Sequence, residues 1–121
     1  MSKMEDTAKL YAAKMDEMNK KVSKLQEDID EVTKQISELP EKLNGQSQEY
    51  IDREKKKLEK KLAKKTEGLQ KFIKEKTEQI ENWFNDMMNS IQKAQEAAMK
   101  LMVEMELEAL KKLQEEKAKH P

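Results

Sequence analysis

Apolar residues follow two different periods along the chain. In the first stretch they recur at alternating steps of three and four residues, which is a heptad repeat. One set of heptad positions holds Ala8, Met15, Val22, Ile29, Ile36 and Leu43, and the other holds Met4, Tyr11, Met18, Leu25, Val32 and Leu39. This pattern predicts a helix whose apolar seam faces another helix.

The second stretch, residues 47–118, repeats its apolar residues at a step of 11 residues. One row consists of Leu58, Leu69, Ile80, Ile91, Met102 and Leu113, and the row beside it of Ile51, Leu62, Ile73 and Phe84. A period of about 3.67 residues per turn is typical of a straight or slightly right-handed helix. The unbroken rows predict one continuous helix of roughly 105 Å.

A turn separates the two predicted helices. Pro40 lacks an N–H and disfavours helical geometry at the residue before it, so we expect the first helix to span 3–39. The dipeptide Asn44-Gly45 tolerates positive φ, and Ser47 is a suitable N-cap. The sequence therefore predicts a turn over 40–46, a helix over 47–118 and a single elongated domain over 1–121.

We predict an all-α fold, an elongated antiparallel helical hairpin with a protruding C-terminal helix. Folding about the turn pairs Ile29 with Leu62, Val22 with Leu69, Met18 with Ile73 and Tyr11 with Ile80, and sets Trp83 and Phe84 against Ala8 and Ala12. The alternative is a three-helix bundle with a break in the polar segment 85–90. The 11-residue row crosses that segment without a phase shift and without Gly or Pro, which favours the hairpin.

The second helix is longer than the first, and we expect the part of it that the first helix covers to end near Met87. Beyond that point apolar residues surround much of the helix, and a helix of this kind is normally buried. We therefore expect this part to bind a protein partner or another copy of the chain. The predicted interaction residues are Trp83, Phe84, Met87, Met88, Ile91, Met99, Leu101, Met102, Met105, Leu110 and Leu113. For Trp83, Phe84, Met87 and Met88, packing at the end of the hairpin is the competing interpretation.

Composition narrows the class of protein. The chain has 121 residues, of which 41% are charged and 36% hydrophobic, a balance typical of long helices with a thin apolar seam. Its formal net charge is zero, and it has no Cys. With no long apolar run, we expect a protein that is not secreted, has no transmembrane span, and acts in the cytoplasm or inside a macromolecular assembly.

A basic band covers residues 53–65. Its candidate phosphate contacts are Arg53, Lys55, Lys56, Lys57, Lys60 and Lys61. Binding of nucleic acid through this band is one alternative function, but no aromatic residues interleave with the lysines. The competing interpretation is a solvated helical face opposite acidic residues of the first helix, such as Glu27 and Glu31.

A second alternative is a helix that lies on a membrane surface. The 11-residue amphipathic pattern resembles that of apolipoprotein-like helices, which bury an apolar face in the lipid interface. Glu104, Glu106 and Glu108 stand where such a helix favours lysine. Lipid binding would also not require the heptad seam of the first helix.

The chain shows no pattern that indicates catalysis. Its one histidine, His120, stands beside Pro121 at the end of the sequence, and no Gly-rich phosphate loop or nucleophile motif occurs. We expect no enzyme activity, cofactor, metal or small-molecule substrate. The leading hypothesis is a non-catalytic structural or interaction protein, a coiled-coil scaffold or adaptor in a larger assembly such as a viral particle.

Overall fold

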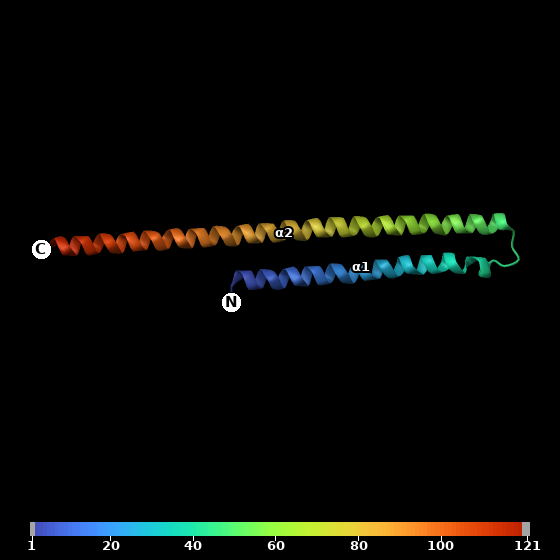
Figure 1. Ribbon diagram of the computed structural model, residues 1–121, viewed down its shortest axis with the longest axis horizontal. Coiled ribbons are helices and arrows are strands. Elements are labelled where there is room, and N and C mark those ends of the chain that lie inside the picture. Colours follow the sequence, from blue (N-terminus) through green and yellow to red (C-terminus); the bar gives the residue numbers. More distant parts are fainter. Residues whose placement is uncertain (1, 120–121) are drawn as a thin grey trace.

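Two long helices packed antiparallel make up this all-α chain, as the computed structural model shows for residues 2–119 (Figure 1). Helix α1 spans Lys3–Lys42 and helix α2 spans Gln48–Lys119. The predicted hairpin with a protruding second helix is confirmed. The three-helix bundle is wrong, because α2 runs through residues 85–90 without a break.

Helix α1 begins at a capped end and extends past its predicted end. The backbone N–H of Glu5 donates to Ser2 Oγ at 3.2 Å. The acidic residues of the first turn interact favourably with the positive end of the helix dipole. The expected end at Leu39 is wrong, since the helix includes Pro40 and ends at Lys42. A proline so near the C-terminus removes one hydrogen bond only, and the Leu43 N–H still donates to the Leu39 carbonyl at 3.0 Å.

The connection between the helices follows the predicted turn chemistry. Gly45 has φ +94°, a conformation that side chains with a Cβ rarely adopt, and it is the one described residue with positive φ. The Gln46 N–H donates to the Leu43 carbonyl at 3.0 Å. Ser47 caps α2, because its Oγ accepts from the Tyr50 N–H at 3.3 Å. Both the glycine and the serine therefore have the expected roles.

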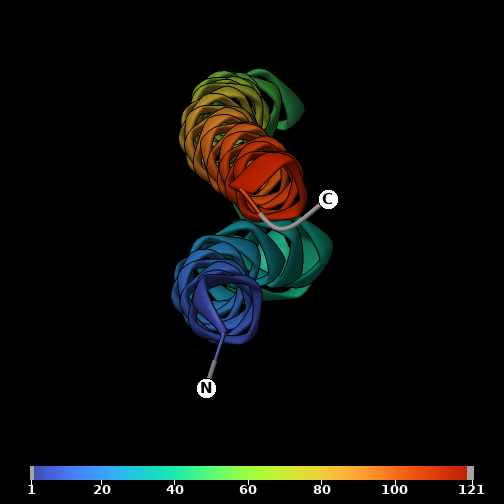
Figure 2. The same ribbon diagram turned by 90° about the vertical axis from the view of Figure 1, so that its left-hand side faces the viewer.

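A thin apolar seam joins the two helices. From α2 it buries the middle of the 11-residue row, Leu69, Ile80 and Ile91. From α1 it buries Met18, Ile29, Val32 and Leu39, all of which belong to the predicted heptad set. Viewed from the free end of α2, α1 lies along one side of that helix (Figure 2). The seam is the only core that the described residues form.

One N-terminal position of the heptad seam was predicted one residue out of place. Ala8 is exposed, and its neighbour Thr7 is the residue that faces α2, with 2% of its surface exposed. Burial of the threonine leaves no polar atom unpaired, because Thr7 Oγ1 donates to the Lys3 carbonyl at 2.7 Å. A hydroxyl that bonds to its own helix can therefore replace an apolar side chain here.

The helices also pair about one turn away from the predicted register. The ring centroids of Tyr11 and Phe84 lie 5.1 Å apart, and Thr77 Oγ1 is 4.0 Å from Met18 Sδ. The predicted pairing of Tyr11 with Ile80 is therefore wrong. It assumed that the two helices start level at the turn, whereas α2 begins beyond the end of α1 (Figure 1).

The shifted register changes what surrounds the aromatic residues of α2. Phe84 packs against the ring of Tyr11, with an angle of 59° between the ring planes. The prediction set Phe84 against the small residues Ala8 and Ala12, whereas the ring of Tyr11 lies beside it. An inclined aromatic pair fills this layer of the hairpin.

Candidate interaction surface

Helix α2 extends far beyond α1, whose first residues lie beside Ala94 and Ala98, and past these residues it has no partner helix within the described chain. We call residues 92–119 the overhang, and every residue in it is exposed. Its large apolar side chains expose between 53% and 67% of their surface. They are Met99, Leu101, Met102, Val103, Met105, Leu107, Leu110 and Leu113. Six of the predicted interaction residues belong to this set.

The overhang continues the face of α2 that packs against α1. Met102 and Leu113 lie in the same 11-residue row as Ile91, which is only 7% exposed. At 100° per residue Lys100, Glu104 and Lys111 lie on the opposite side of the helix, whereas Glu106 lies only about 40° from Met102. The overhang therefore has a broad apolar face aligned with the seam, interrupted by Glu106, and a mostly charged side turned away from it that also holds Leu107.

The other predicted interaction residues belong to the hairpin. Ile91 is buried beneath the start of α1, and Trp83, Phe84, Met87 and Met88 are half-buried. Lys14 places its Nζ 4.9 Å from the centre of a Trp83 ring. These side chains take part in the packing of α1 on α2, so the structure separates them from the exposed set in the overhang.

Two lysine–aromatic contacts were missed at the sequence level. Besides Lys14 over Trp83, Lys21 Nζ lies 4.7 Å from the centre of the Phe72 ring. The two lysines are one heptad apart on α1, and the two aromatic residues are one 11-residue step apart on α2. These intervals differ, about 10.5 Å on α1 and about 16.5 Å on α2, so the sequence held no signal from which the two contacts could be predicted. Such contacts are favourable because the ring face attracts a cation.

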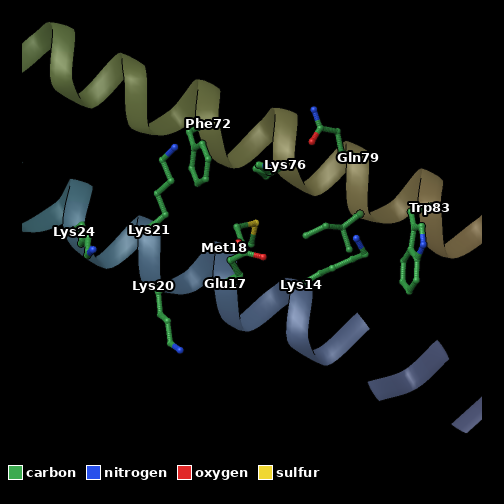
Figure 3. Close-up of a pocket in the computed structure, with 11 residues that line it drawn as sticks. Lys14, Glu17, Met18, Lys20, Lys21, Lys24, Phe72, Lys76, Gln79 and Trp83 are labelled. Atoms are coloured by element: carbon green, nitrogen blue, oxygen red, sulfur yellow. The ribbon is translucent and has the colours of Figure 1, made fainter. Parts of the chain in front are cut away.

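The same residues line an open cavity of about 560 Å³ between the helices (Figure 3). Lys21 extends toward Phe72, while Lys20 points away from the cavity and binds Asp16 at 3.2 Å. The residues that line the cavity are Lys14, Glu17, Met18, Lys20, Lys21, Lys24, Phe72, Lys76, Gln79, Ile80 and Trp83. Two of these lysines, Lys14 and Lys21, place their charged ends over the aromatic rings of Trp83 and Phe72.

The basic band lies on the surface of α2 near the turn. Arg53, Lys55, Lys56, Lys57, Lys60 and Lys61 are all exposed. Lys57 Nζ is 3.1 Å from the Glu54 carboxylate on the same helix. Each of the four ion pairs within residues 2–119 likewise joins side chains of one helix. The acidic residues of α1 therefore do not form ion pairs with the band.

Groups that could support chemistry do not gather within the described chain. No cluster of three or more His, Asp or Glu residues there could hold a metal ion. No buried side-chain nitrogen or oxygen in that part of the chain lacks a hydrogen-bond partner. His120 lies outside the described residues. No described helix has both the length and the apolar character that crossing a membrane requires.

Comparison of the chain with protein families, with curated proteins and with solved structures found no match. The class of protein therefore follows from the geometry. The chain is a two-helix hairpin whose second helix carries exposed apolar residues beyond the first. Those residues form the surface that the fold offers for an interaction.

Proposed function

We propose that this chain is a non-catalytic structural or interaction protein, a coiled-coil scaffold or adaptor in a larger assembly such as a viral particle. Its overhang docks onto a helix of another copy or of a partner protein. One observation carries the proposal: α2 keeps its apolar row beyond the point at which α1 stops covering it.

The size of the exposed surface supports docking. Met102, Met105 and Leu113 expose 61%, 63% and 54% of their surface on the face that continues the seam. Complete burial of one such side chain contributes about 1.5 to 3 kcal/mol. Burial of several such side chains together can offset the translational and rotational freedom that two molecules lose on association, which costs at least about 4 kcal/mol. Contiguous apolar surface of this kind marks interaction sites in soluble proteins.

A double substitution in the overhang tests the proposal. Met102→Lys with Met105→Lys places two charges on the apolar face, so the variant should run at a lower mass than the wild type in light scattering behind size exclusion. Circular dichroism and melting of the hairpin should change little, because Met102 and Met105 lie on the part of α2 that extends beyond α1.

The control variant adds the same two charges on the other side of the helix. Ala97→Lys with Gln114→Lys should leave the mass of the complex unchanged, because both positions lie away from the apolar face. The proposal fails if the wild type is monomeric and the Met102/Met105 variant loses helix content cooperatively. The overhang would then pack within its own chain.

A further inference from the structure

We infer that the occupant of the overhang is a second copy of this chain, antiparallel to the first, with the two-fold axis passing beside Ala109. The inference rests on the proposed docking function and adds the identity, direction and register of the partner. The complex would then consist of two hairpins joined through their overhangs.

Continuity of the seam gives the direction. Helix α1 runs antiparallel to α2 and covers its 11-residue row as far as Ile91. Met102 and Leu113 extend the same row along the overhang. A helix that continues the line of α1 on this face meets side chains of the same kind at the same spacing. The overhang of a second copy is itself such a helix and carries the same apolar row.

The spacing of the apolar face gives the register. Met105 and Leu113 stand at equal distances before and after Ala109. When the helix is reversed about Ala109, Met105 of one copy therefore lies opposite Leu113 of the other. A two-fold interface requires this self-complementarity, because each copy uses the same patch. A small residue at the axis also allows two helix backbones to approach closely.

A second symmetric register exists, but α1 blocks it. That register places Leu113 of one copy opposite Ala94 of the other. In the structure the first residues of α1, including Lys3 and Met4, already lie beside Ile91, Ala94 and Ala98 around a shared cavity of about 310 Å³. A partner helix cannot occupy the same place. In the register centred on Ala109, the described residues of the second copy lie opposite residue 99 and beyond, past the cavity that α1 lines.

Charges along the overhang also favour the antiparallel arrangement. Glu104, Glu106 and Glu108 stand between Lys100 on one side and Lys111 and Lys112 on the other. In the register centred on Ala109, Glu108 of one copy lies on the same flank as Lys112 of the other, and symmetry repeats the pair. In a parallel pair in register, the same flank of the two copies would lie on opposite sides of the interface, so Glu108 of one copy would not lie beside Lys112 of the other.

Single cysteine substitutions test this geometry in the full chain, because the chain has no cysteine of its own. A disulfide needs Cα atoms within about 7 Å. Ala109→Cys should therefore link to itself, and most of the oxidised protein should run at the mass of two chains. In Met105→Cys alone or Leu113→Cys alone, the two sulfurs stand about 12 Å apart along the helix, so neither variant should link to itself. When these two variants are mixed, a disulfide should join one chain of each, because Met105 of one copy lies opposite Leu113 of the other.

The linking pattern separates failure of this inference from failure of the proposed function. Equal self-linking of all three variants would mean a parallel pair, which overturns the antiparallel register but keeps the overhang as a docking surface. A wild type with the mass of one chain, and no linked product, overturns the second copy as occupant. The helix content of the Met102/Met105 variant then decides separately whether the overhang is a free surface.

Discussion

Individual side chains in the seam are important to this hairpin because each layer between the helices holds few of them. Leu69 and Ile80 expose 8% and 6% of their surface, whereas Leu10 on α1 exposes 50%. Contacts at the margin of the seam include lysine stems over Phe72 and Trp83. The four ion pairs of the described residues lie at the surface, with Glu54 alone half-buried, so each contributes little to stability.

A matched pair of leucine substitutions tests this distribution of stability. Leu69→Ala should lower the free energy of unfolding by about 2 kcal/mol, near the low end for a buried leucine, because water can enter the narrow seam. Leu10→Ala should lower it by less than about 0.5 kcal/mol. Urea unfolding at one protein concentration measures both. Equal losses from the two variants would show that the hairpin does not pack as described.

At the scale of the elements, the turn and the helices use their two glycines differently. Gly45 has φ +94°, whereas Gly68 lies inside α2 with nothing within 4 Å of an added Cβ. The first glycine permits the path between α1 and α2. The second has helical geometry and only increases the freedom of the unfolded chain.

Alanine at these two positions should therefore have opposite effects. Gly45→Ala should lower the free energy of unfolding by about 1 to 2 kcal/mol, since it forces a Cβ into the left-handed region. Gly68→Ala should raise it by about 0.5 to 1 kcal/mol, because alanine favours the helix and has fewer unfolded conformations. Thermal melting of both variants provides the measurement. Stabilisation by Gly45→Ala would contradict the positive φ of the turn.

For the whole molecule, shape and charge limit the partners that the overhang can take. The formal net charge is zero, so no overall field attracts nucleic acid or anionic lipid. The overhang presents an apolar face to solvent together with Glu104, Glu106 and Glu108. Helices that lie on lipid instead favour lysine and arginine on their polar face. These properties favour a protein helix as the partner.

Vesicle titration distinguishes the protein partner from a membrane surface. We expect Trp83 fluorescence to keep its wavelength, and the chain not to sediment with vesicles, for both anionic and zwitterionic lipid. The Met102→Lys/Met105→Lys variant provides the comparison, because it removes the apolar face. A blue shift with lipid in the wild type that the variant lacks would favour the membrane-surface alternative.

The helices, the turn chemistry and the apolar face of the overhang were determined by the sequence alone. Each depends on residues close together in the chain: the heptad set of α1, the 11-residue row of α2, and Gly45 and Ser47 at the turn. Local periodicity suffices for such features because it fixes which side of a helix is apolar. The amphipathic overhang was predictable for the same reason.

Only the tertiary structure decided how the helices slide along one another. A shift of one turn brings apolar rows back into contact, so periodicity allows several registers of similar quality. The path of the connection and the fit of particular side chains, such as Phe84 on Tyr11, select one of them. That register brings α1 over Ile91 and therefore fixes where the overhang begins. The start of the overhang is therefore set by contacts between residues far apart in the chain. The repeating pattern of one helix carries no information about these contacts.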